Sequence, residues 1–159
     1  MEAVWQCGIY FIPNAVAQTH RISTGMTVSA AERELIMEGD NSALPSEELR
    51  QLQLILPAGQ SWSNDLEVLG DLESTCGAFH RENHSVISIY ARCDLRTFSI
   101  EVANAVMKLA SAMDCLLLTD DNKVISPSTS DLKAEIKDSS AYRFVKIPKG
   151  FIADLSKAP

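Results

Sequence analysis

The chain has 159 residues, of which 46% are hydrophobic and 22% are charged, and its formal net charge at pH 7 is −7. A chain of this length and composition buries a substantial core without disulfides or metal, so we expect a single α+β domain over residues 1–159. The negative balance disfavours nucleic acid and anionic membranes as partners, because phosphate groups are bound by lysine and arginine.

The first residues lack the features of a targeting segment. Met1, Glu2 and Ala3 provide no basic region, and the apolar run behind them ends at Pro13. This run is too short for a secretory signal or a membrane-spanning helix, so we expect a cytoplasmic protein. The four cysteines suit a reducing compartment, and three of them are expected to be buried free thiols: Cys7, Cys93 and Cys115.

The first third of the chain predicts a strand followed by two helices. Alternating apolar positions indicate a strand over Val4–Ile12. Ser29 and Glu32 have the spacing of a capping box, so a helix is expected beyond them. Ser46 is the candidate N-cap of a second helix, whose apolar residues continue to Leu56.

The middle of the chain predicts a β-hairpin. A loop leads into Leu66–Leu69, and Leu72–Arg81 is expected to be a strand that turns at residues 82–84 into a strand starting at Ser85. Apolar residues alternate along this last strand, which indicates one buried face and one exposed face. Three residues are predicted to lie on the exposed face: Ser88, Arg92 and Asp94.

A helix and a second hairpin follow. From Thr97 the apolar residues recur at three- and four-residue steps, which predicts a helix that ends near Asp114. Cys115–Leu118 is wholly apolar, as is typical of a central strand. Residues 120–122 are turn formers, Val124 and Ile125 resume the strand, and a last helix places two residues on one buried side: Leu132 and Ile136.

The predicted order of elements is strand, helix, strand, strand, helix, strand, strand, helix. Helices that connect strands of one sheet pack on a face of that sheet, so this order predicts an α+β two-layer sandwich. Within it we expect a ferredoxin-like βαββαβ core with an added hairpin strand and a C-terminal helix.

No motif in the sequence predicts a reaction. The histidines and cysteines of the first hairpin form the one cluster with ligand-type side chains: Cys76, His80, His84 and Cys93. Cys76 and His80 lie about 13 Å apart along one face of a strand, which is too far for two ligands of one ion. The chain has no nucleophile elbow, phosphate-binding loop or zinc-protease motif. We therefore expect no catalytic residue, no metal and no cofactor.

The net charge is concentrated in one segment. Residues 32–73 contain ten acidic and two basic residues, whereas the rest of the chain is close to neutral. Such a segment either keeps the surface soluble or steers a basic protein partner towards it. Trp62 lies in this segment and is a candidate anchor, although a tryptophan folded back over the core is the alternative. The predicted partner-binding residues are Glu32, Glu34, Glu38, Asp40, Glu47, Glu48, Trp62, Asp65, Glu67, Asp71 and Glu73.

Several short runs resemble a group of small bacterial proteins that are similar to the immunity partners of polymorphic or contact-delivered toxins. The runs are Ser61–Leu66, Leu69–Asp71, Arg92–Arg96, Leu116–Thr119 and Ser140–Val145, with Pro148 and Phe151. The resemblance covers roughly the last hundred residues and assigns no role to particular residues.

The sequence thus favours a non-catalytic protein-binding domain. The resemblance implies an immunity protein that neutralises a cognate bacterial toxin by direct binding. A rigid preformed surface suits such inhibition, because it avoids the ordering costs of association. Two alternatives remain, a regulatory small-molecule-binding or homodimeric domain and a small enzyme of unknown chemistry. A cleft containing Cys76, His80 or Arg92 would favour the enzyme.

Overall fold

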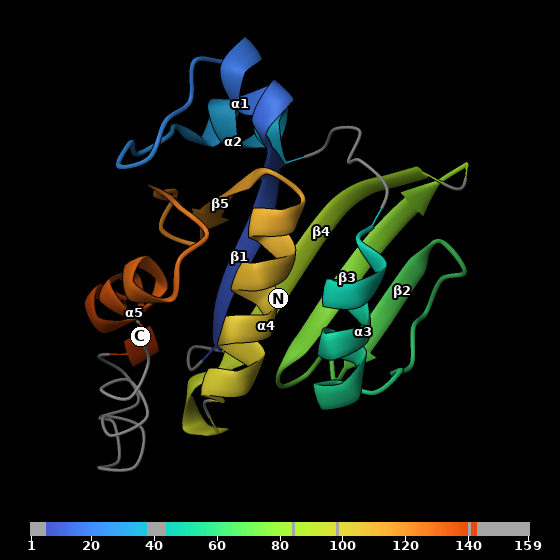
Figure 1. Cartoon of the computed structure of the whole chain (residues 1–159). Coiled ribbons are helices and arrows are strands. Elements are labelled where there is room, and N and C mark those ends of the chain that lie inside the picture. Colours follow the sequence, from blue (N-terminus) through green and yellow to red (C-terminus); the bar gives the residue numbers. More distant parts are fainter. Residues whose placement is uncertain (1–5, 38–43, 84, 98, 140, 143–159) are drawn as a thin grey trace.

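Six antiparallel strands form one sheet in the computed structural model, which describes residues 6–37, 44–83, 85–97, 99–139 and 141–142 (Figure 1). The order across the sheet is β2-β3-β4-β1-β5-β6. The strands are β1 (Gln6–Pro13), β2 (Leu66–Gly70), β3 (Cys76–Glu82), β4 (Ser85–Asp94), β5 (Cys115–Thr119) and β6 (Val124–Ile125). The helices are α1 (Asn14–Thr19), α2 (Ala30–Ile36), α3 (Ser46–Ile55), the 3-10 helix η1 (Leu95–Thr97), α4 (Ile100–Ala112) and α5 (Thr129–Asp138).

Strand β1 lies inside the sheet, because it pairs with β4 on one side and with β5 on the other. Alternate residues of a strand point to opposite faces of its sheet. Ile9 and Phe11 are therefore buried under the layer of α3 and α4, while Tyr10 and Ile12 point to the other face.

Helices α3 and α4 lie side by side over one face of the sheet (Figure 1). The main hydrophobic core fills the space between them and the strands, and α5 contributes to the same core. Its largest fully buried side chains come from both layers: Phe11, Leu52, Leu69, Phe79, Ile89, Leu95, Leu109, Leu117 and Ile136. This arrangement is α+β and is compatible with a two-layer sandwich.

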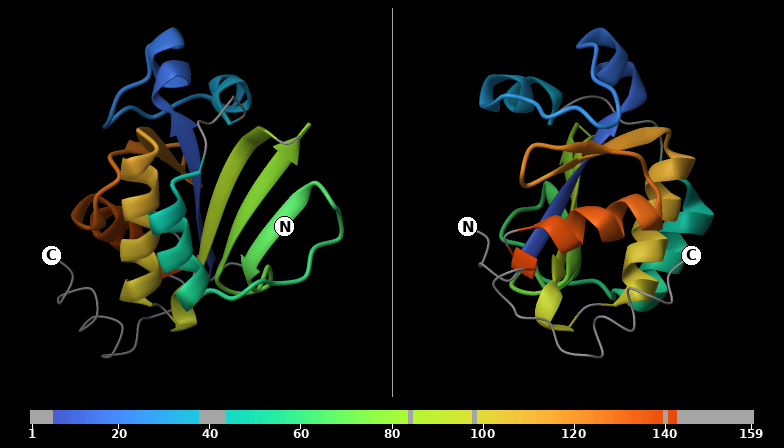
Figure 2. Two further views of the ribbon diagram at one scale, coloured as in Figure 1. Left: turned by 45° about the vertical axis from the view of Figure 1, so that its right-hand side comes forward. Right: turned by 90° about the vertical axis from the view of Figure 1, so that its left-hand side faces the viewer.

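A smaller hydrophobic cluster lies on the opposite face. Helices α1 and α2 sit at the end of the sheet that β1 leads to, beside β5 (Figure 1). The cluster joins these helices to the face of β1, β5 and β6: Ile12, Ala17, Ile22, Val28, Ile36, Leu118 and Val124. The part of this face that belongs to β2, β3 and β4 has no helix over it in the described chain (Figure 2).

Loop backbone lies along both outer strands of the sheet. On β2, the Gly59 amide donates to the Val68 carbonyl at 2.8 Å and the Gly70 amide donates to the Pro57 carbonyl at 2.7 Å. On β6, the Val124 amide donates to the Met26 carbonyl at 2.8 Å. The hydrogen-bonding groups at the two edges are thus partly used within the chain.

Most of the predicted elements are present. The capping box is confirmed, since Ser29 Oγ accepts from the Glu32 amide at 3.1 Å and Glu32 Oε1 accepts from the Ser29 amide at 3.0 Å. The turn after β5 places Asn122 at a positive φ of 63°, and Leu132 and Ile136 are buried as expected. All four cysteines are free thiols, and Cys93 and Cys115 are buried as expected. Cys7 is only half-buried, which corrects the prediction for it, and Cys76 is buried instead. No helix within the described ranges is long and apolar enough to span a membrane.

Three further predictions need correction. Ser46 is not an N-cap: Pro45 takes that position, and α3 starts without a side-chain cap. Residues 72–75 form a turn, and the sheet gains a strand, β2, that the predicted order did not include. The position of Asp94 on the strand predicts an exposed side chain, but Asp94 is 1% exposed. Its carboxylate forms an ion pair with Arg96 in place of contacts with water. Residues 4–5 of the first predicted strand lie outside the described residues.

Candidate binding hollow on the open sheet face

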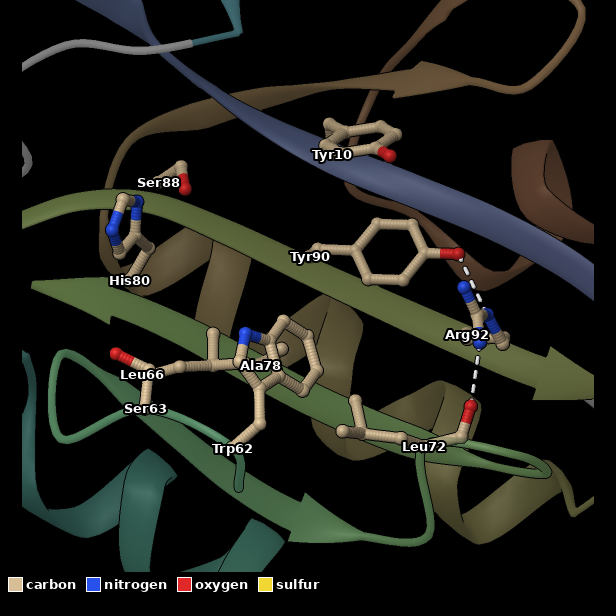
Figure 3. A pocket seen from close by; sticks show the side chains of 10 residues that line it. All are labelled: Tyr10, Trp62, Ser63, Leu66, Leu72, Ala78, His80, Ser88, Tyr90 and Arg92. Atoms are coloured by element: carbon tan, nitrogen blue, oxygen red, sulfur yellow. Dashed lines mark hydrogen bonds between the residues drawn. The ribbon is translucent and has the colours of Figure 1, made fainter. Parts of the chain in front are cut away.

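A hollow of about 390 Å³ lies on the sheet face opposite α3 and α4 (Figure 3). Its floor comes from β1, β3 and β4, and the connection between α3 and β2 forms one wall. Volumes of 300–1,000 Å³ are typical of sites for small ligands or for single side chains of a partner. Ten residues line it: Tyr10, Trp62, Ser63, Leu66, Leu72, Ala78, His80, Ser88, Tyr90 and Arg92.

The strand register explains why the face is hollow at this place. Ala78 lies opposite Tyr90, and His80 lies opposite Ser88. The small side chains of Ala78 and Ser88 leave space beside the larger Tyr90 and His80, because paired residues project to the same face. A shallow depression along β3 and β4 results.

Two tyrosines and two arginines form a row across this face, here called the aromatic row: Arg33, Tyr10, Tyr90 and Arg92. The ring centroids of Tyr10 and Tyr90 lie 4.5 Å apart at an interplanar angle of 42°. The Arg33 guanidinium lies 4.9 Å from the Tyr10 centroid, and that of Arg92 lies 5.2 Å from the Tyr90 centroid. A cation within about 6 Å of a ring face is attracted by the ring quadrupole, so each end of the row is held by a charge.

Both arginines are also fixed by hydrogen bonds. Arg92 Nε donates to Tyr90 Oη at 2.9 Å, and its Nη1 donates to the Leu72 carbonyl at 2.5 Å (Figure 3). Arg33 Nη1 donates to the Thr119 carbonyl and to Asn122 Oδ1, each at 2.9 Å. The Arg92 charge therefore has a defined position in the wall of the hollow, and binding a ligand there costs little side-chain entropy.

Trp62 is 79% exposed and stands at the edge of the hollow, beside Leu66 and Leu72 (Figure 3). The loop that carries it is shaped locally, since Ser61 Oγ donates to the Ser63 carbonyl at 2.9 Å. The start of this loop is tied to β2 through Gly59. The structure thus decides between the two predicted placements: Trp62 is not folded over the core.

The predicted acidic residues do not gather in one place. Glu32 and Glu34 lie on α2, Glu47 and Glu48 in the first turn of α3, and Asp65 and Glu67 at the start of β2; Asp71 and Glu73 lie in the β2–β3 turn. Helix α2 and the β2–β3 turn are at opposite ends of the sheet (Figure 1). Of the predicted acidic residues, Asp65 and Glu67 lie closest to Trp62 in the sequence. Glu38 and Asp40 are outside the described residues.

Several of these carboxylates have structural partners. Glu32 belongs to the capping box of α2, whose Ser29 amide lowers the pKa of the Glu32 carboxyl. Glu67 pairs with Arg81 at 2.9 Å, and Glu47 pairs with Arg50 at 2.9 Å on an exposed helix surface. The Asp71 carboxylate accepts from the Glu73 amide and closes a turn. Part of the acidic charge thus stabilises local structure.

The cluster of histidines and cysteines is divided by the strand geometry. Cys76 is completely buried, while His80 lines the hollow four register pairs further along β3. No group of three or more ligand-type side chains comes together within the described residues. His84 is outside these residues, and burial raises the pKa of the Cys93 thiol to about 12.

The hollow combines aromatic faces, hydroxyl groups, an imidazole and a guanidinium. None of its ten described lining residues is acidic, although the chain carries 21 acidic residues. Ser88 and His80 lie opposite each other, but no hydrogen bond joins them in the described part of the chain. The arrangement is suited to binding a planar or anionic group.

Sequence reasoning did not identify the hollow. The sequence places Ser88 and Arg92 on the exposed face of one strand, and Tyr10 lies in another predicted strand. The feature of the sequence that could have indicated the hollow is the set of polar and aromatic residues at alternate positions of these strands. The register that joins β1, β3 and β4 was needed to recognise it as one site.

Comparison of the chain with protein-family models, with curated proteins and with solved structures finds no match.

Proposed function

We propose that the protein works by binding another protein through the open face of its sheet. The observation that carries this proposal is Trp62, a large side chain with 79% of its surface exposed at the edge of a shaped hollow. Tryptophan and arginine are the residues most enriched at the energetic centres of protein interfaces. An exposed tryptophan that lines the same hollow as a fixed arginine is therefore a favourable anchor.

The more specific form of this proposal is an immunity protein that neutralises a bacterial toxin. It is supported by the resemblance of the runs around Trp62 and Arg92 to immunity proteins, and by the rigid β-sheet that carries the hollow. Such inhibition needs a surface that blocks the toxin and no reaction of its own. The net charge of −7 favours a toxin with a basic surface.

We also infer a ferredoxin-like core within the sheet. Strands β3, β4, β1 and β5 are neighbours in this order, and α3 and α4 lie in the connections that the βαββαβ arrangement assigns to helices. On this interpretation β2 and β6 are edge strands added at the two sides.

The experiment compares two exposed apolar side chains on opposite layers. Tagged wild-type protein, Trp62→Ala and Leu54→Ala are used to capture proteins from a lysate of the native host, and the captured proteins are identified by mass spectrometry. Leu54 on α3 is 75% exposed, so it is a matched control on the helical layer. We expect one protein that wild type and Leu54→Ala retain and that Trp62→Ala loses.

The toxin hypothesis requires a further result. The retained protein must arrest growth when it is expressed alone and must be harmless when it is co-expressed with wild type. Retention by Trp62→Ala at the wild-type level would contradict the proposed surface. If the retained protein is not toxic, the proposed binding function would stand and the immunity hypothesis would be rejected.

A second candidate function is the binding of a small molecule. The observation that favours it is the volume of the hollow, about 390 Å³, which lies in the range of small-ligand sites. Equilibrium dialysis of the purified protein against extracts of the host, followed by mass spectrometry, tests it directly. A compound enriched by wild type and not by Ala78→Leu, which fills the hollow, is the expected result.

A further inference from the structure

We propose that the hollow binds an aromatic carboxylate, with the carboxylate beside Arg92 and the aromatic ring between Trp62 and Tyr90. This inference rests on the proposed function, in which the open sheet face is the binding surface. It adds the chemistry of the group that enters.

The electrostatic argument concerns the sign of the charge that the hollow accepts. Its ten lining residues include Arg92 and His80 and no acidic residue, in a chain with 21 acidic and 14 basic residues. A cationic group would meet the fixed Arg92 charge, and like charges at close range repel. An anionic group meets the guanidinium of Arg92, a positive charge that its hydrogen bonds to Tyr90 and Leu72 hold in place.

The shape argument concerns the apolar part of the ligand. Ala78 forms the floor, with the Tyr90 ring on one side and Trp62, Leu66 and Leu72 on the other (Figure 3). Aromatic rings stack against such walls with a gain beyond simple burial. A flat ring fits this space better than a branched aliphatic group does.

The spacing argument joins the two parts. Tyr90 and Arg92 are alternate residues of β4, so their side chains leave the same face of the sheet, and the Arg92 guanidinium carbon lies 5.2 Å from the centroid of the Tyr90 ring. This separation equals a few covalent bonds, as between the ring and the carboxylate of an aromatic amino acid. Ser88 and His80 lie beyond Tyr90, where a polar substituent on the ring would meet them.

Two sources carry this chemistry, a free aromatic acid and the C-terminal aromatic residue of a protein partner. Both present the same ring and the same carboxylate to the hollow. A blocked amino acid with a free carboxylate imitates either source, so one probe tests the site and a competition experiment separates the sources.

The probes are N-acetyl-phenylalanine and its neutral amide, which differ only in the charged group. The full chain is titrated with each probe, and binding is measured by calorimetry and by the chemical shift of the Ala78 methyl group. We expect the acid to bind at least tenfold more tightly than the amide, which is the ratio that one charge-assisted hydrogen bond supplies. We expect the shift of Ala78 to change with the acid.

Three variants assign the binding to the hollow. Arg92→Met should bring the affinity of the acid down to that of the amide, and Arg92→Lys should keep part of the difference. Ala78→Leu places a larger side chain in the floor of the hollow and should abolish binding of both probes, while a cooperative thermal transition shows that the variant is folded. Lys108→Met removes a charge from α4 on the other layer and should leave the affinity unchanged.

The outcomes separate this inference from the proposed function. Equal binding of acid and amide, no binding of either, or a preference that survives Arg92→Met would overturn the inference and leave the Trp62 capture result standing. If the acid binds and displaces the captured protein, the partner supplies the carboxylate. If the acid binds and displaces nothing, the ligand is a free aromatic acid.

Discussion

At the scale of single residues, Asp94 shows how a local ion pair changes the burial of a strand position. Its side chain is 2% exposed and accepts from Arg96 Nη2 at 2.7 Å, from Arg96 Nε at 3.0 Å and from Ser74 Oγ at 3.2 Å. Alternation along β4 predicts an exposed side chain here. The turn that supplies Ser74 is far away in sequence, so the sequence pattern did not indicate that it covers Asp94.

The Arg96 hydrogen bond, opposed by burial, holds the pKa of the Asp94 carboxyl below its usual value. We expect Asp94→Asn to lower the free energy of unfolding at pH 7 by about 1.5–3 kcal/mol, the contribution of hydrogen bonds to a charged group. Urea denaturation measures this loss. Because the folded pKa is lowered, the stabilisation is present above the unfolded pKa and disappears as the pH falls through the folded one. The difference between variant and wild type should therefore shrink in acid.

Glu47→Gln is the control for this prediction. It also removes a carboxylate from an ion pair with an arginine, but the Glu47 side chain is 58% exposed. Water screens such pairs, so the loss should be much smaller than that of Asp94→Asn. Equal losses would contradict a special role for the buried carboxylate.

At the scale of elements, the two predicted helix starts show what a short motif does and does not determine. The Ser29 capping box was recognised because it needs two side chains at a fixed spacing, and both bonds are present. Ser46 was selected as a cap from its type alone. The structure places Pro45 at the cap in an extended conformation, and Ser46 lies inside the first turn.

These two serines provide a matched pair of substitutions. Ser29→Ala removes an acceptor from the start of α2 and should lower the free energy of unfolding by about 1 kcal/mol. Ser46→Ala removes no cap and should change it by less than about 0.5 kcal/mol. Urea denaturation, with amide hydrogen exchange over residues 30–36, measures both. A larger loss from Ser46→Ala than from Ser29→Ala would contradict the assigned caps.

Sequence periodicity predicted most of the helices and strands because each depends on neighbouring residues. Helix α1 was not predicted, since six residues after Pro13 are too few for a helical period to be recognised. The hollow was not predicted either. It depends on which strands are neighbours, and residue-by-residue patterns do not contain this information.

At the scale of the whole molecule, the acidic residues 32–73 spread over both ends of the sheet, so their effect on a partner is a long-range one. A net charge of −7 accelerates the approach of a basic protein, and ionic strength weakens this effect. On the proposed function, the non-acidic hollow would then select the group that enters. The net charge and the hollow would thus act at different stages of association.

Charge reversal at Glu48 and Asp65 tests the first stage. We expect the double substitution to lysine to slow association with the captured partner by about tenfold at low salt and to reduce the dependence of the rate on salt. Surface plasmon resonance at two salt concentrations measures both effects. Lysine at Glu101 and Asp121 changes the net charge equally and is the control, since both lie outside residues 32–73. The same slowing in both variants would show that position within the acidic segment has no influence.

The loop backbone along β2 and β6 has a consequence for how anything attaches to this protein. Many recognition domains capture a peptide by adding it as one more strand, and many β-proteins polymerise by the same route. Here residues 57–59 and 25–28 already take up that role at both margins. Addition of a further strand is therefore hindered at both edges, which favours recognition through side chains of the open sheet face and lowers the tendency to form fibrils.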